Sequence, residues 1–136
     1  MVRLMMGSKG SGKTKQVIDL INSAASTEHG NVVCIERGTK LTYDIHYKIR
    51  LVEASEYDLN SFETLRGFVS GLYAGNYDIT HVFIDSLCKI VPSEVNHDVE
   101  LFLDWLNAFS ERHGIKFTVT ISVDPSAATE GMQRYL

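Results

Sequence analysis

One stretch near the amino terminus decides the fold: Gly7-Ser8-Lys9-Gly10-Ser11-Gly12-Lys13-Thr14. It matches the pattern G-x-x-x-x-G-K-S/T, in which each residue type serves the binding of phosphate groups. Glycines permit backbone angles that a Cβ forbids, so the loop can curl and direct successive N–H groups at a phosphate chain. Lys13 brings a positive charge to the β- and γ-phosphates, and the Thr14 hydroxyl is a ligand for Mg²⁺.

The sequence on both sides of this loop supplies the context that the pattern requires. Residues 2–6 form an apolar run that predicts a strand ending at the loop. Residues 13–25 predict a helix, because apolar side chains recur on one of its faces. Those side chains are Val17, Leu20, Ile21 and Ala24. Strand, glycine loop and helix in this order indicate a phosphate-binding site at the start of the helix.

Length and composition favour one domain over residues 1–136, because the chain is long enough for one core and too short for two. The net charge is -4, which gives no general signal for nucleic-acid binding. Cys34 and Cys88 lie in or beside apolar runs, which favours buried thiols and a cytoplasmic location. The first apolar run is too short for a signal peptide or a membrane span, and no other run approaches spanning length.

Further strands are expected at residues 31–35, 50–54, 80–85 and 116–123. One helix is expected to begin at Asn60 or Ser61, with Glu63 assisting the cap, and to end at Gly75. A second runs from Asn96 to Gly114, and the tail, residues 124–136, is expected to be partly helical. Alternating strands and helices predict an α/β protein: a three-layer α/β/α sandwich with a mainly parallel five-stranded sheet. Ligands of such sheets lie beyond the carboxyl ends of the strands.

Asp85 is the strongest candidate at those strand ends. It closes the apolar run Val82-Phe83-Ile84 and so has the form of a Walker B segment. The carboxylate of such a segment holds Mg²⁺ opposite the hydroxyl of the phosphate-binding loop. Thr14 and Asp85 are therefore the predicted metal ligands.

With the glycine loop and Asp85 together, the chain resembles the P-loop NTPases, and the likeness covers most of its length. A strand intervenes between the loop strand and the Asp85 strand in chain order, and the sequence holds no guanine-reading N/T-K-x-D element. Both features favour the RecA-like branch, which places a further strand between those two in the sheet. The final strand, residues 116–123, is expected to occupy that place. The layout is also similar to the nucleotide-binding half of thymidine kinases and to short bacterial chains labelled twitching-motility ATPases.

The resemblance also suggests roles for residues at the other strand ends. RecA-like ATPases commonly carry a catalytic Glu after the Walker B Asp, and here that position is Ser86. Glu36 is then the first candidate for the catalytic carboxylate and Glu53 the second. Ser122, with Thr120 behind it, matches the position of a side chain that senses the γ-phosphate. No arginine finger is assigned, although Arg37 lies near the strand ends and Arg134 lies in a tail expected to be mobile.

Three functions are compatible with this sequence. The first is a protein that binds ATP with Mg²⁺ through the loop residues 7–14 and Ser122 and hydrolyses it slowly, with Lys13 and Glu36 as catalytic residues. The second is a nucleotide-gated binding module with little or no hydrolysis, which Ser86 after Asp85 favours. The third, a small nucleoside or metabolite kinase, is disfavoured because the chain holds no lid-sized insertion.

Two further expectations concern partners. The loop strand, residues 2–6, is expected at the sheet edge, where an uncovered apolar strand invites pairing. A second copy of the chain or the tail is therefore expected to cover it. The segment Tyr43 to Lys48 concentrates aromatic and charged side chains, and it is the one stretch suited to contact a base or a partner.

Overall fold

The computed structural model describes residues 1–39 and 41–136 and contains a five-stranded sheet. Its strands are β1 (Val2–Met6), β2 (Asn31–Glu36), β3 (Arg50–Glu53), β4 (Ile79–Asp85) and β5 (Lys116–Ile121). All of the strand pairs are parallel, and the order across the sheet is β1-β5-β4-β2-β3. The last strand thus lies between β1 and β4, which confirms the placement expected from the sequence.

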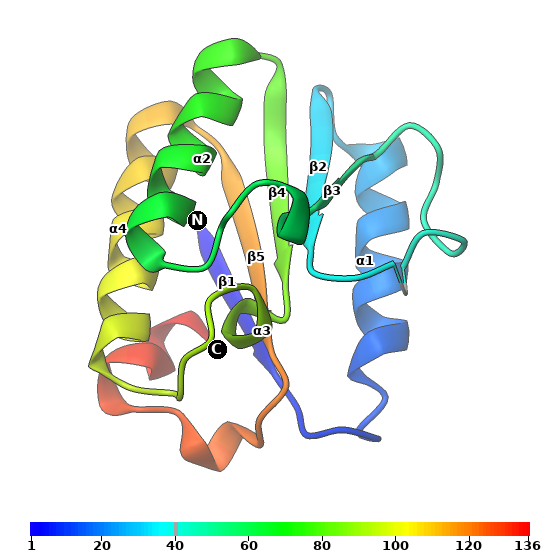
Figure 1. The fold of residues 1–136 in the computed structure, drawn as a ribbon. Coiled ribbons are helices and arrows are strands. Elements are labelled where there is room, and N and C mark those ends of the chain that lie inside the picture. The colour runs from blue at the N-terminus through cyan, green and yellow to red at the C-terminus, as the bar shows by residue number, and fades with distance from the viewer. Residues whose placement is uncertain (40) are drawn as a thin grey trace.

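Helices cover both faces of this sheet (Figure 1). Helix α1 (Lys13–Thr27) lies on one face, and α2 (Phe62–Gly75) and α4 (His97–His113) lie on the other. A short helix, α3 (Leu87–Ile90), follows β4 directly. The predicted α/β class is confirmed, and the sheet is wholly parallel where a mainly parallel one was expected. None of the helices in the described part of the chain is long and apolar enough to cross a membrane.

Alternation along the strands produces two separate apolar cores. On the α2 and α4 side, Ile35, Ile84 and Val119 pack with side chains of the two helices. On the α1 side, Cys34 and Phe83 pack with Val17 and Ile21. Asp85 lies two residues after Phe83, so its side chain projects from the same face as α1 and the glycine loop.

Several boundaries differ from the sequence prediction. Helix α2 is capped by Ser61, whose hydroxyl accepts from the Thr64 N–H at 3.1 Å, so Glu63 takes no part in the capping box. Ala54 begins a 3-10 turn (Ala54–Glu56) instead of ending β3. Strand β5 stops at Ile121, before Ser122. The predicted bounds of α4 are correct: Asn96 caps its start, and Gly114, at φ 70°, ends it.

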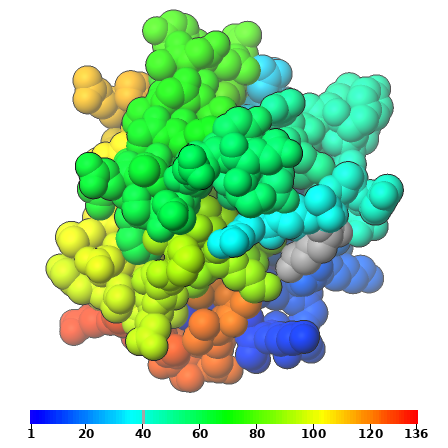
Figure 2. Space-filling model, in the orientation of Figure 1, coloured from blue at the N-terminus to red at the C-terminus, as the bar shows by residue number. Residues whose placement is uncertain are grey.

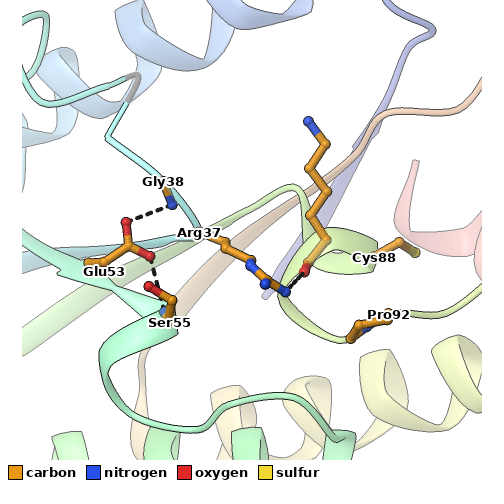
Figure 3. A pocket seen from close by; sticks show the side chains of 7 residues that line it. Arg37, Gly38, Glu53, Ser55, Cys88 and Pro92 are labelled. Carbon is orange, nitrogen blue, oxygen red and sulfur yellow. Dashed lines mark hydrogen bonds between the residues drawn. The ribbon is translucent and has the colours of Figure 1, made fainter.

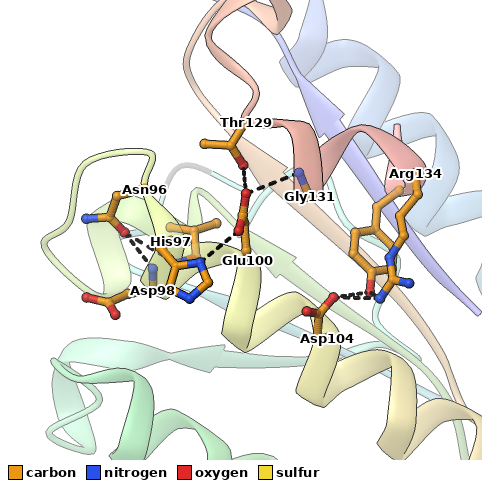
Figure 4. Close-up of polar contacts among 10 residues, drawn as sticks. Asn96, His97, Asp98, Glu100, Asp104, Thr129, Gly131 and Arg134 are labelled. Carbon is orange, nitrogen blue, oxygen red and sulfur yellow. Dashed lines mark hydrogen bonds and ion pairs between the residues drawn. The ribbon is translucent and has the colours of Figure 1, made fainter.

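The tail folds back against the sheet as two 3-10 helices, Pro125–Ala127 and Glu130–Tyr135. Met132 is fully buried, and the second helix packs on α4 and β1. The structure thus places the tail against the edge strand, one of the two covers expected from the sequence. The expectation that Arg134 lies in a mobile tail is wrong, because its Nη2 donates to Asp104 Oδ1 at 2.6 Å (Figure 4).

Two carboxylates of α4 hold this tail (Figure 4). Asp104 accepts hydrogen bonds from Arg134 and, at 2.6 Å, from the Tyr135 hydroxyl. Glu100 accepts from the Thr129 hydroxyl and from the Gly131 N–H at 3.1 Å. These hydrogen bonds lower the pKa of both carboxyl groups. The end of the tail is therefore anchored to α4 at two successive turns of the helix.

The connection between β2 and β3 packs beneath α1 through Leu41, Ile45 and Ile49, all of them buried. The Asn22 side chain of α1 adds two hydrogen bonds to it, one to the Asp44 carbonyl and one from the His46 N–H, both at 2.8 Å. Tyr43 and Tyr47 remain 93% and 86% exposed on its surface.

Candidate functional site

The carboxyl ends of β3, β2 and β4 bring three carboxylates into register. Glu36 is the Cα partner of Asp85 on one side and of Glu53 on the other. Neighbours in register project from the same face of a sheet, so all three side chains lie on the α1 side. Glu36 and Asp85 are each 4% exposed. The sequence predicted these residues as site candidates separately, and the fold places them in one row.

The glycine loop leaves β1 and turns back into α1. Gly10 and Gly12 have φ of 88° and 84°, which is the left-handed region that only glycine adopts without strain. At Gly7 a Cβ would lie 2.5 Å from Ser11 Oγ, so a larger residue would displace that exposed side chain. The Gly7 N–H donates to the Ile121 carbonyl at 3.3 Å and so joins the loop to the end of β5. The backbone path therefore favours glycine at positions 10 and 12.

A cavity of about 770 Å³ opens over the loop. Six of the predicted loop residues line it: Ser8, Lys9, Gly10, Gly12, Lys13 and Thr14. Ser122, at the end of β5, and Lys89 of α3 complete the wall. In Figure 2 the loop, the segment after β4 and the segment after β5 meet on the face shown. The structure therefore gathers most of the predicted binding residues around one space.

The charge of this cavity is one-sided. Its wall holds three lysines, Lys9, Lys13 and Lys89, and the described residues that line it include no carboxylate. The whole chain has a net charge of -4, so this concentration of cations runs against the overall balance. Such a wall attracts a polyanion. Lys89 is the residue that sequence reasoning missed, and its only sequence signal is its place four residues after Asp85.

Lys13 and Ser122 meet directly. Lys13 is 8% exposed, and its ammonium donates to Ser122 Oγ at 3.1 Å. The two residues lie far apart in the chain, and β1 pairing with β5 brings them together. The structure thus places Ser122 beside Lys13 of the glycine loop, and its role as a sensor stays a prediction.

Asp85 is held from behind by Thr120 of β5. The Thr120 hydroxyl donates to Asp85 Oδ1 at 2.7 Å and accepts the Ser86 N–H at 2.7 Å. Thr120 is 1% exposed, so both bonds are made away from solvent. Asp85 itself is not among the described residues that line the loop cavity, and it lies at the adjoining strand end. Thr120, expected behind Ser122, thus fixes the carboxylate of β4.

Ser86 has a strained backbone. Its φ is 56°, an unusual value for a residue other than glycine, and it is 6% exposed. Its hydroxyl is buried with no hydrogen-bond partner among the described residues. Strain and an unsatisfied buried hydroxyl are both unfavourable, and such residues concentrate at functional sites. Ser86 is therefore a further candidate for a functional residue, whereas the sequence identified it only as a departure from the family pattern.

The two candidates for a catalytic carboxylate have different surroundings. Glu53 accepts the Gly38 N–H at 2.6 Å on one oxygen and the Ser55 N–H at 3.0 Å on the other (Figure 3). These hydrogen bonds, of which the one from Ser55 has the largest effect, lower the pKa of Glu53. Both oxygens of Glu53 are therefore occupied by backbone N–H groups. Glu36 lies next to Asp85. Burial raises the pKa of the Cys34 thiol, and the negative charges of Asp85 and Glu36 raise it further, which places both carboxylates near that thiol.

The oxygen donors present fit a magnesium ion, which prefers carboxylate and hydroxyl oxygens. Thr14 of α1 is among the residues that line the loop cavity, and the Asp85 carboxylate ends β4 with one oxygen fixed by Thr120. Both predicted ligands thus lie at the same edge of the sheet.

Searches against protein-family models and against curated proteins match no family and no protein to this chain.

Proposed function

We propose that this chain has a P-loop NTPase fold of the RecA-like branch and binds ATP with Mg²⁺ in the loop cavity. The observation that carries the proposal is the cavity itself, of about 770 Å³, whose described lining includes the glycine loop and three lysines and no carboxylate. Backbone N–H groups of Gly10 to Lys13 would bind the phosphate chain, with the Lys13 ammonium at the β- and γ-phosphates.

Thr14 and Asp85 would hold the magnesium ion, which neutralises phosphate charge when bound. Thr120 keeps Asp85 oriented for this, because its hydroxyl bonds one carboxylate oxygen at 2.7 Å. Ser122 keeps the Lys13 ammonium at the end of β5, at 3.1 Å. Phosphoryl transfer needs chiefly positioning and charge stabilisation from a protein, and these residues supply both.

Slow hydrolysis of ATP is the proposed activity, with Glu36 as the candidate carboxylate for the attacking water. Glu36 lies in register with Asp85, and neither is among the described residues that line the loop cavity. Glu36 is preferred over Glu53 because both oxygens of Glu53 accept backbone hydrogen bonds. A nucleotide-gated module without hydrolysis is the second candidate. It is favoured by the serine, instead of a carboxylate, that follows Asp85.

Calorimetric titration with ATP and Mg²⁺ tests the binding. Lys13→Ala should abolish the heat of binding, whereas Lys116→Ala, at the opposite end of β5, should leave it unchanged. Unaltered binding by Lys13→Ala would reject the proposal.

Turnover separates the two candidate functions. A slow ATPase should release phosphate faster than Lys13→Ala does, and Glu36→Gln should reduce that rate at least about 100-fold while it keeps binding. A wild-type rate equal to that of Lys13→Ala would favour the gated module.

A further inference from the structure

A second cavity, of about 590 Å³, adjoins the loop cavity along the carboxyl edge of the sheet. Its lining includes Arg37, Glu53, Ser55 and Cys88, which come from the ends of β2 and β3 and from α3 (Figure 3). Lys89 lines both cavities. The two spaces therefore share one wall, and a ligand in the second cavity would lie beside a ligand of the glycine loop.

Arg37 is held in place over this cavity. Its Nη1 donates to the Lys89 carbonyl at 3.3 Å, which joins the residue directly after β2 to the backbone of α3. A guanidinium carries five N–H donors, and the structure shows this one hydrogen bond for it within the described residues. The remaining donors form the planar fork that matches a carboxylate or a phosphate.

Among the described residues of the lining, Glu53 is the one carboxylate, and it does not occupy that fork. Its two oxygens accept the backbone N–H groups of Gly38 and Ser55, at 2.6 and 3.0 Å. The described lining also includes two cationic residues, Arg37 and Lys89, so cations outnumber carboxylates there. The apolar part of the wall comes from Cys88 and Pro92.

We infer that the second cavity binds a small molecule bearing an oxyanion group, held by Arg37 and Lys89 next to the nucleotide. This extends the proposed function, because the nucleotide is the neighbour, but the recognition belongs to residues outside the glycine loop. The class of ligand is a small phosphate or carboxylate compound that fits about 590 Å³.

Amide NMR spectra with inorganic phosphate as the probe test this inference. The ¹⁵N-labelled protein is first saturated with ATP and Mg²⁺ and then titrated with phosphate. Saturable shifts are expected at the Gly38 and Ser55 amides and at the Arg37 Nε–H. Arg37→Ala should weaken this binding at least about tenfold, because an ionic hydrogen-bonded fork is lost. Arg37 is exposed, so the variant should keep its fold.

Arg112→Ala serves as the matched control, since it removes the same charge from α4. Phosphate shifts at Gly38 and Ser55 that persist in Arg37→Ala, or that fail to saturate, would overturn the inference. Movement of these amides with ATP alone, together with weaker ATP binding by Arg37→Ala, would overturn it too, by assigning the cavity to the nucleotide.

The proposed function fails in a different way. If ATP leaves the Gly10, Gly12 and Lys13 amides unmoved, nucleotide binding is rejected. Phosphate alone, added without ATP, would then still report on Gly38 and Ser55 and decide the inference separately.

Discussion

At the amino end of β4, the His81 ring bonds Thr118 Oγ1 at 2.9 Å, and an ion pair joins Glu28 to Lys116 at 2.8 Å nearby. At the carboxyl end, Lys13, Lys89 and Lys9 line an open cavity, and Ser86 is strained. Polar groups at the amino end contact one another, whereas lysines at the carboxyl end line a cavity of about 770 Å³. The comparison shows that the cationic cavity lies at the carboxyl edge of the sheet.

Two threonines of β5 allow this difference to be measured with the same substitution. Thr120→Val removes the hydroxyl that bonds both Asp85 and Ser86, and it should lower the free energy of unfolding by about 3 kcal/mol. Thr118→Val removes one bond, to His81, and should cost about 1 kcal/mol. Urea unfolding measures both.

The same two variants should also differ in nucleotide binding. Thr120→Val should weaken the binding of Mg-ATP, because Asp85 loses its orienting partner, and Thr118→Val should not. Equal losses of affinity in the two variants would contradict the functional division between the ends.

Acid should reduce the stability of the fold through His81, near the amino end of β4. Burial lowers the pKa of His81 to about 4 from its ordinary 6.5. The unfolded chain therefore binds a proton between these values while the folded protein does not, so stability is lost as the pH falls from 6.5 towards 4. We expect a loss of roughly 2 kcal/mol from this residue, after allowance for its partial exposure.

His81→Gln provides the reference, because carboxyl groups with a lowered pKa also make the fold less stable in acid, as the pH falls to their ordinary pKa values near 4 and below. The wild type should fall more steeply than His81→Gln in urea titrations at successive pH values. Parallel curves would show that His81 is not buried in its neutral form.

Lysines at the two ends should respond oppositely. Lys89→Ala should weaken the binding of ATP about tenfold, the equivalent of about 1.4 kcal/mol, because Lys89 is one of the lysines that line the loop cavity. It should leave stability unchanged, because the hydrogen bond from Arg37 goes to the backbone carbonyl of Lys89. Lys116→Ala should leave ATP binding unchanged and cost about 1 kcal/mol of stability, because it breaks an ion pair whose lysine is 51% exposed and whose Glu28 side chain is 9% exposed. Calorimetry and urea unfolding give the two values, and a reversed pattern would refute the division.

The smallest effect is expected from relieving strain. Ser86→Gly removes the cost of φ 56° in a non-glycine residue and should raise stability by up to about 1 kcal/mol. If the strain serves the site, the same change should reduce ATP turnover or affinity. Asp58→Gly, at the other positive φ of 54°, should leave ATP binding as it is.

The sequence predicted correctly those elements whose patterns lie within one short segment of the chain. Glycine spacing predicted the loop, and apolar runs and periodicity predicted the strands and the three long helices, α1, α2 and α4. It also placed Ser122 near Lys13, because the family pattern inserts β5 beside β1. The order of strands then follows from those signals together with one family resemblance.

What the sequence did not predict depends on segments meeting in space. Lys89 and Arg37 approach because α3 directly follows β4, the strand that pairs with β2, and α3 itself is too short for a periodic signal. The role of Thr120 required the register between β4 and β5. At the start of α2 the Thr64 hydroxyl completes the capping box of Ser61, whereas the sequence analysis expected Glu63 to assist the cap. The tail carries no strong pattern, and its position depends on contacts with Glu100 and Asp104.

A crystal structure of the protein with Mg²⁺ and a non-hydrolysable ATP analogue tests the central claim most directly. We predict phosphate oxygens within hydrogen-bond distance of the Gly10, Gly12 and Lys13 N–H groups, and a metal ion between Thr14 and Asp85. An analogue bound elsewhere, with the loop cavity containing only water, would contradict the claim.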